Sequence, residues 1–226
     1  MCATPLTAPA GSATIFGVMT PNDKSAYTPP RPNYYTGYGD VTVTHANLPH
    51  WSKAQTTTFV TFRLADSLPQ EKLLRLQQEK ADWIASHPQP WDDETQQAFR
   101  SIFYGPVQKW LDAGFGCCLL RDPRSQRIVE DTLWHFADTR YALYAYVIMP
   151  NHVHVLLMPT GDHNITDIIS SIKRFSARHI NEVFGREGPL WQKESFDTLV
   201  RNERHFQTIV RYIRRNNPKR AWSAYQ

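Results

Sequence analysis

Five short stretches of the chain either alternate apolar and polar residues or run apolar without interruption. Most of them are rich in β-branched and aromatic residues, and this composition and period are typical of strands. Pro150 and Asn151 separate two of them, and so short a turn favours antiparallel neighbours. We predict strands, the second and the last as short candidates, at 58–64, 117–120, 141–149, 152–158 and 195–200.

Elsewhere the apolar residues recur every three or four positions, which is the period of a helix with one buried face. Asn164 and Asn202 stand where side-chain caps are expected, at the starts of the last two such segments. Gly105 and Pro106 fall inside the second and predict an interruption, because proline lacks the amide hydrogen that a helix interior needs. The predicted helices span 69–87, 91–114, 124–138, 164–185 and 203–215.

The order of these elements is typical of an α+β fold. Without a helical insertion at about 66–115, the chain reads strand, helix, strand, strand, helix, strand, with one more helix at the C-terminal end. This is the ferredoxin-like split β-α-β order, an antiparallel sheet with helices on one face. Residues 1–55 lack any period and are rich in Pro and Tyr, so we expect an extended or partly disordered arm whose tyrosines could dock onto the body. Residues 56–226 would then form a single domain.

Positive charge is concentrated in the last third of the chain. The 226 residues carry a net charge of +4. From residue 160 onward there are 12 Lys or Arg against 7 Asp or Glu, whereas the preceding part is close to neutral. A phosphate-rich partner fits this distribution. For charge alone, a solvated helix surface is the commoner explanation.

The sequence also bears on where the protein works. No apolar run approaches the roughly 20 residues that a membrane span needs, and the N-terminal stretch lacks the blocks of a signal peptide. The three cysteines, Cys2, Cys117 and Cys118, show neither metal-type nor disulfide-type spacing. We therefore expect a globular protein of the reducing cytoplasm, without a membrane partner.

Two histidines interrupt the apolar strand at 152–158. Because side chains alternate along a strand, His152 and His154 share one face, while Val153 and Val155 point to the other. Two imidazoles on one face can both reach one divalent ion. A chance pair at the end of a strand is common, however, so the pair alone leaves both interpretations open.

The last helix adds a second candidate pair. Tyr212 and Asn216 are four residues apart and share a helix face at the border of the apolar stripe. A phenol there could act as a nucleophile, and an amide oxygen one turn later could be a metal ligand. Taken alone, the pair is much better explained by a half-buried packing tyrosine and a C-terminal capping asparagine.

The chain resembles the REP-associated tyrosine transposases in three blocks that occur in this order: "MPNHVHVLLMP", "WQKESFDTLVRN" and "YIRRNNPKRAW". These are relatives of the single-tyrosine HUH transposases of small insertion sequences, in which U is a bulky apolar residue, here Val153. The strand "FVTFRLADSLP" also looks like the first strand of that family. The resemblance covers roughly 57–222, and it is weakest in the arm and the insertion.

The resemblance implies a nuclease centre. In that family the two histidines hold Mg²⁺ or Mn²⁺, which matches His152 and His154 here, and the nucleophile matches Tyr212. The residue that completes the metal shell matches Asn216, with Asn217 as the substitute if the helix ends early. The implied activity is that of a single-stranded DNA endonuclease and strand transferase, which nicks hairpin-containing DNA through a 5′-phosphotyrosine intermediate.

The expected partner is single-stranded or hairpin DNA, bound by a monomer or a homodimer in the prokaryotic cytoplasm, at the nucleoid. A domesticated protein that binds DNA hairpins without strand transfer is the alternative. A metal hydrolase acting on small phosphoesters is a third hypothesis, which lacks the extra Asp and His ligands such sites gather. The basic residues expected to contact DNA are Lys173, Arg174, Arg178, Arg211, Arg214, Arg215, Lys219 and Arg220.

Overall fold

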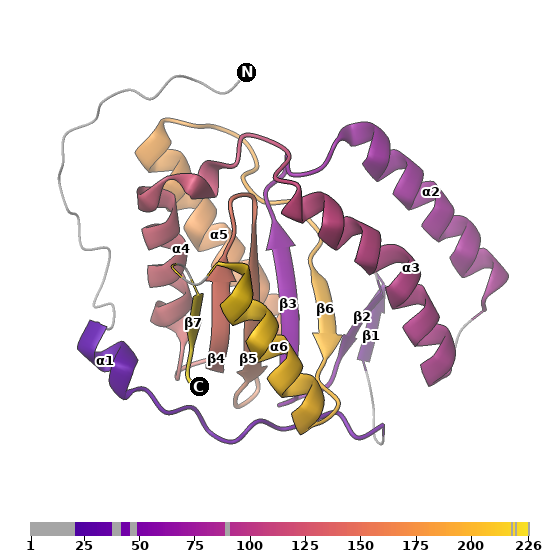
Figure 1. Ribbon diagram of the computed structural model, residues 1–226, viewed down its shortest axis with the longest axis horizontal. Coiled ribbons are helices and arrows are strands. Elements are labelled where there is room, and N and C mark those ends of the chain that lie inside the picture. The colour runs from indigo at the N-terminus through magenta and orange to yellow at the C-terminus, as the bar shows by residue number, and fades with distance from the viewer. Residues whose placement is uncertain are drawn as a thin grey trace.

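The computed structural model describes residues 21–37, 42–45, 49–88, 91–217, 219 and 221–225. Within them, five strands form one sheet in the order β6-β3-β5-β4-β7, and each neighbouring pair is antiparallel (Figure 1). The first four of these are the order of a split β-α-β fold, so the predicted ferredoxin-like α+β class is confirmed. The strands are β3 (Thr58–Arg63), β4 (Tyr141–Ile148), β5 (His152–Pro159), β6 (Phe196–Leu199) and β7 (Ala221–Ser223).

Helices cover both faces of this sheet, but they do so in separate groups. Helices α4 (Pro123–Phe136) and α5 (Ile165–Phe184) bury their apolar stripes against one face, as predicted. Helix α6 (Glu203–Asn216) packs on the opposite face, through Phe206, Ile209, Val210 and Ile213. A bulge between Leu143 and Ala145 in β4 keeps apolar residues directed into both cores. The C-terminal helix therefore covers the face that the other two leave free.

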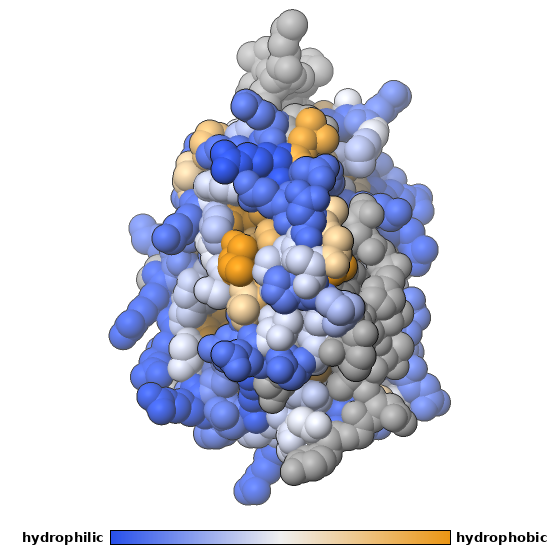
Figure 2. Space-filling view, turned by 90° about the vertical axis from the view of Figure 1, so that its right-hand side faces the viewer, coloured by the Kyte–Doolittle hydropathy of each residue, from blue (hydrophilic) through white to orange (hydrophobic). Residues whose placement is uncertain are grey.

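The insertion forms two helices, α2 (Gln70–Ser86) and α3 (Asp93–Asp112). The interruption predicted at Gly105 and Pro106 is wrong, because α3 continues through Pro106. Phe103 and Val107, on either side of that proline, are both buried, and their packing holds the two halves together. The side of the molecule on which α2 and α3 lie carries apolar surface bordered by hydrophilic side chains (Figure 2).

The strand predicted at 117–120 is also wrong. A 3-10 helix, η1 (Leu119–Arg121), stands there, and Cys118 before it has a φ of 50°, which no strand residue adopts. A run of apolar residues without a period marks burial, and Cys118 and Leu120 are buried in a turn. Four elements have no counterpart in the prediction: α1 (Pro21–Ala26), β1 (Thr42–His45), β2 (Pro49–Ser52) and β7.

The described part of the N-terminal arm lies along the body and is held by its tyrosines. The hydroxyl of Tyr27 accepts a hydrogen bond from the amide of Leu143 at 3.0 Å, and its ring meets the edge of Trp134. The hydroxyl of Tyr34 donates to a carboxylate oxygen of Glu203 at 2.5 Å. Residues 1–20 lie outside the described residues. Among the helices that are described, none has the length and apolar character to cross a membrane.

Candidate active site

Strand β5 presents its two histidines to the face covered by α6. Val153 and Val155 are in the opposite core with α4 and α5, as alternation requires. His152 and His154 are both completely buried. Burial lowers the pKa of His152 to about 3 and holds the pKa of His154 well below its usual range, so both imidazoles are neutral at pH 7.

The two imidazoles converge with the tyrosine of α6. The Nε2 atoms of His152 and His154 are 3.0 Å apart. The hydroxyl oxygen of Tyr212 is 3.3 Å from Nε2 of His154, and the two rings meet at 64°. Phe59 stacks on the imidazole of His154 at a centroid distance of 5.4 Å and also meets the ring of Tyr212 at 6.2 Å, so the three rings pack against one another.

The hydrogen bonds behind the histidines determine how they are protonated. Nδ2 of Asn151 donates to the carbonyl of Phe115 at 3.0 Å, which turns Oδ1 of Asn151 toward Nδ1 of His152 at 2.8 Å. Nδ1 of His152 must therefore carry the hydrogen, and the lone pair of the neutral ring lies on Nε2, the atom 3.0 Å from Nε2 of His154. Nδ1 of His154 is 2.7 Å from the hydroxyl of Thr61, which can either donate or accept.

The insertion supplies two polar residues that sequence reasoning missed. Nε2 of Gln108 lies 3.3 Å from Nε2 of His154 and 3.1 Å from a carboxylate oxygen of Asp112. That same oxygen is 3.9 Å from Nε2 of His152. Gln108 and Asp112 are four residues apart at the end of α3, a spacing visible in the sequence. What sequence could not supply is the long-range packing that places this turn beside β5.

The phenol of Tyr212 is half-buried, and burial raises its pKa above the usual value. The negative charge of Asp112 raises it further, whereas the nearby polar side chains of Asn216 and Gln108 oppose the rise. Helix α6 continues through Asn216, with Asn217 as its C-cap, so it does not end early. Nδ2 of Asn216 is buried and has no hydrogen-bond partner among the residues that the structure describes.

The types of these residues and the distance between the two imidazoles fit a divalent cation, but the set of ligands is incomplete. Two neutral imidazoles and an amide are suitable ligands. Two ligands about 2.1 Å from an ion and at right angles to each other are about 3.0 Å apart, as the two Nε2 atoms are. No described residue accepts a hydrogen bond from the buried Nδ2 of Asn216. The amide group can therefore turn and present its oxygen as a ligand. Among the described residues, however, no group of three His, Cys, Asp or Glu could hold a metal ion.

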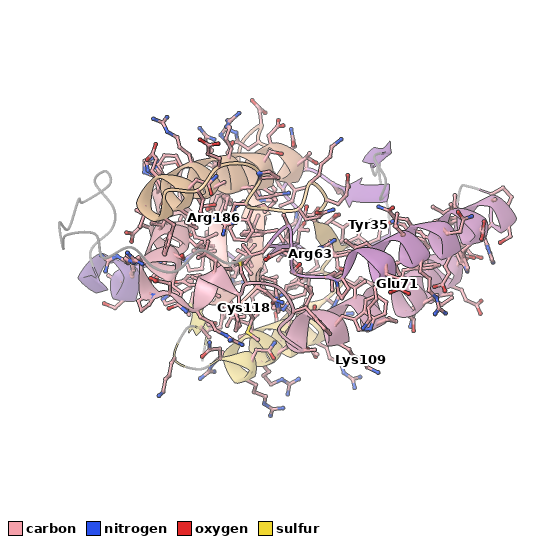
Figure 3. The ribbon with its side chains drawn as sticks, turned by 90° about the horizontal axis from the view of Figure 1, so that it is seen from above. Tyr35, Arg63, Glu71, Lys109, Cys118 and Arg186 are labelled. Carbon is pink, nitrogen blue, oxygen red and sulfur yellow. The ribbon has the colours of Figure 1, made fainter. Side chains whose placement is uncertain are left out.

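The predicted DNA-binding residues fall into two groups. Those on α5 lie on the opposite face of the sheet from the histidines, and Figure 3 shows α5 and α6 on its two sides. Among them, Lys173 donates to the carbonyl of Lys193 at 2.7 Å, and Arg178 pairs with Glu182 at 3.0 Å. Exposed residues of α6 and the segment after it stand close in sequence to Tyr212: Arg211, Arg214, Arg215 and Lys219. Arg220 lies outside the described residues, and Arg174 is exposed on α5.

The fold and the site together define a class of protein. It is a ferredoxin-like α+β domain in which a strand with two histidines faces a tyrosine on a C-terminal helix. Residues 121–216 match the family model described as "Transposase IS200 like". This matched segment contains both histidines, Tyr212 and Asn216, so the part of the chain that carries the site is similar to the IS200-like transposases.

Two of the solved structures that this chain is similar to are transposases. A REP-associated tyrosine transposase bound to a REP hairpin is 18% identical, with a TM-score of 0.40, and the match covers 77% of this chain and 74% of the other. A candidate transposase from Deinococcus radiodurans is 18% identical, with a TM-score of 0.31 and coverages of 71% and 90%. Neither likeness is close enough to assign roles to individual residues. No curated protein matches the chain.

Proposed function

We propose that this protein is a single-stranded DNA endonuclease and strand transferase of the REP-associated tyrosine transposase type. It nicks hairpin-containing DNA and becomes linked to the 5′-phosphate through Tyr212. The observation that carries the proposal is the position of the Tyr212 hydroxyl, 3.3 Å from a buried, neutral His154 whose Nε2 lies 3.0 Å from that of His152. A nucleophile and a pair of cation ligands within one hydrogen-bond length are what metal-assisted phosphoryl transfer requires.

In the proposed reaction, the Tyr212 oxygen forms a bond to phosphorus and the bond from phosphorus to the 3′-oxygen breaks. The phenol proton passes to solvent water, and the departing 3′-oxygen takes up a proton, so the step is balanced. One phosphodiester replaces another. A second 3′-hydroxyl can therefore attack the phosphotyrosine and rejoin DNA without a nucleotide cofactor.

The surrounding residues position the nucleophile and its neighbours. The rings of Phe59 and Tyr212 both pack against the imidazole of His154, and Thr61 and Asn151 contact Nδ1 of His154 and of His152 respectively. His152, His154 and Asn216 would hold Mg²⁺ or Mn²⁺. When bound, the ion supplies positive charge that polarises the attacked phosphate and favours the phenolate. Gln108 and Asn216 favour the phenolate as well, because both lower the pKa of Tyr212.

Arg211, Arg214, Arg215 and Lys219 are the cations that we expect to contact the DNA backbone near this centre. Arg220 completes the basic segment in the sequence. The three basic residues of α5 lie on the far face, so we expect them to contact DNA only where a hairpin extends around the edge of the sheet. The site of action would be the prokaryotic nucleoid.

The proposal is tested with a labelled single strand that carries a hairpin, incubated with the protein and Mn²⁺. We expect a covalent adduct that survives denaturing electrophoresis, carries the fragment 3′ of the nick, and is abolished by EDTA. Tyr212→Phe should form none. Tyr34→Phe, which removes a hydroxyl bonded to Glu203, is the matched control and should form the adduct.

If Tyr212→Phe forms as much adduct as the wild type, Tyr212 is not the nucleophile. If no hairpin gives an adduct and DNA still binds tightly in EDTA, the chain is a hairpin-binding protein without strand transfer.

A further inference from the structure

A cavity lies between helix α2 and the β3–β6 edge of the sheet. Its volume is about 320 Å³, and neither histidine nor Tyr212 lines it. One wall is apolar, with Leu76, Ile84 and Phe196 among its residues. Arg63 and Lys80 provide the charged part of the lining. Figure 3 places Arg63 in the interior, between the sheet and the helices of the insertion.

Both cations are deeply buried. Arg63 is 4% exposed and Lys80 is 7% exposed. Nη1 of Arg63 donates to the hydroxyl of Ser67 at 3.1 Å, but Nε of Arg63 is buried and has no hydrogen-bond partner in the described part of the chain. A buried guanidinium with an unused donor is costly unless an acceptor reaches it. The cavity thus contains a donor for which the described residues supply no acceptor.

The described lining residues include two cations and one carboxylate. Arg63 and Lys80 face a single carboxylate, that of Glu194, among the described lining residues. Burial lowers the pKa of Lys80 to about 8, and the charge of Glu194 only partly offsets this. An incoming anion would accept a hydrogen bond from the Nε of Arg63, which has no partner among the described residues, and would be attracted by the positive charge of both cations. The lining therefore selects a negatively charged ligand.

The apolar wall narrows the choice of anion. A small inorganic anion would leave most of a 320 Å³ space and the side chains of Leu76, Ile84 and Phe196 unused. A ligand with one anionic group and one flat apolar group satisfies both parts of the lining. A nucleotide has these properties, because its phosphate suits Arg and Lys and its base packs on apolar side chains.

The position of the cavity relative to the site suggests which nucleotide. Arg63 on β3 and His152 on β5 are directly paired, so they project from the same face with Cα atoms about 5 Å apart. We propose that the cavity binds one unpaired nucleotide of the DNA strand, adjacent to the phosphate that Tyr212 attacks, with its phosphate on Arg63 and Lys80 and its base against the apolar wall. This inference rests on the proposed function. A free nucleotide shares the same chemistry, and the experiment separates the two sources.

The test measures binding rather than cleavage, in EDTA, so that it does not depend on the metal or on adduct formation. Fluorescein-labelled oligothymidylate is titrated with the full chain and followed by fluorescence polarisation, and unlabelled dTMP is a separate probe. The variants are Lys80→Met, which removes a cavity charge, and Ala81→Trp, which fills the cavity from the exposed side of α2 and keeps both cations. Lys109→Met, on the exposed side of α3, is the charge-matched control.

We expect Lys80→Met and Ala81→Trp each to weaken oligothymidylate binding at least fivefold, and Lys109→Met by less than twofold. For Lys80→Met, the slope of log affinity against log salt should fall by about 0.7, the value for one phosphate contact on a single strand. Circular dichroism establishes whether each variant is folded. If Lys80→Met does not fold, the binding measured for Ala81→Trp decides the test.

Equal binding by Ala81→Trp, Lys109→Met and the wild type overturns the inference. Weaker binding of dTMP with unchanged binding of oligothymidylate overturns it too, since the ligand would be a free nucleotide. Either result leaves the Tyr212 adduct experiment intact. Conversely, loss of oligothymidylate binding in a protein that forms no adduct would support a nucleotide site while the proposed cleavage fails.

Discussion

The carboxylate of Asp112, at the end of α3, lies 3.9 Å from Nε2 of His152, at the start of β5. Asp112 is partly exposed, and burial raises its pKa above the usual range. Gln108 holds the same oxygen at 3.1 Å and directs it toward the histidines. The helical insertion therefore brings negative charge to the point where a cation is proposed to bind.

Asp112→Asn should weaken Mn²⁺ binding to the DNA-free protein by about tenfold, or ~1.4 kcal/mol. The asparagine keeps the shape of the side chain but removes a negative charge that attracts the cation. Mn²⁺ titration followed by electron paramagnetic resonance measures the affinity directly. Glu79→Gln, on the exposed side of α2, removes the same charge at a distance and should change the affinity little. Equal losses in both variants would mean that Asp112 acts only through net charge.

Thr61→Val should also lower Mn²⁺ affinity, by 10- to 100-fold, roughly the range for losing a group that orients a ligand histidine. The substitution preserves shape but leaves Nδ1 of His154 without its 2.7 Å partner. Unfolding in urea should show a loss of about 1–3 kcal/mol, because a buried polar atom is left unpaired.

Thr58→Val is the matched control for that substitution. It removes a buried hydroxyl from the same strand, one that donates to the carbonyl of Thr56 at 3.0 Å, away from the histidines. We expect a comparable loss of stability with unchanged Mn²⁺ affinity. If Thr61→Val binds Mn²⁺ as well as Thr58→Val does, the hydroxyl does not orient His154 for the cation.

Much of the fold follows from local patterns, because alternation and helical period report which face of an element is buried. The side chains of β5 and the apolar stripes of α5 and α6 are of this kind, and the structure has all three. Three-residue β7 is too short to show a period. The pairing of Thr61 with His154 and the approach of Gln108 depend on tertiary packing, which no local pattern encodes. Pro106 misleads because local propensity yields to the burial of its neighbours.

The loop that precedes η1 supports His152 through Asn151, and Gly116 is the residue of this loop at which a larger side chain would clash. Its φ is +87°, and a Cβ there would lie 2.5 Å from the carbonyl oxygen of Asp66. The adjacent carbonyl of Phe115 accepts from Asn151, which holds His152. Backbone displacement at Gly116 should therefore reach the imidazole through two hydrogen bonds.

Gly116→Ala should cost clearly more stability than Gly188→Ala. Gly188 has nearly the same φ, +86°, but open space around its Cβ position, so it measures the backbone strain alone, about 1–2 kcal/mol. The additional loss of unfolding free energy in Gly116→Ala, relative to Gly188→Ala, measures the clash with the backbone of Asp66. Urea unfolding gives both values, and equal losses would show that the loop moves aside freely.

The stability of the protein should depend on pH through Lys80. Its pKa is about 8 in the folded chain, against 10.5 when unperturbed. Between these values the unfolded chain holds a proton that the folded chain has released, so the free energy of unfolding rises with pH, and below pH 8 this gain is lost. The difference in unfolding free energy between the wild type and Lys80→Met should therefore increase from pH 8 to pH 10. Lys109→Met, which removes an exposed lysine, is the control variant for this comparison. Parallel curves for the wild type and Lys80→Met would mean that Lys80 is solvated, and the cavity would then lack one of the two buried cations on which its affinity for a nucleotide depends.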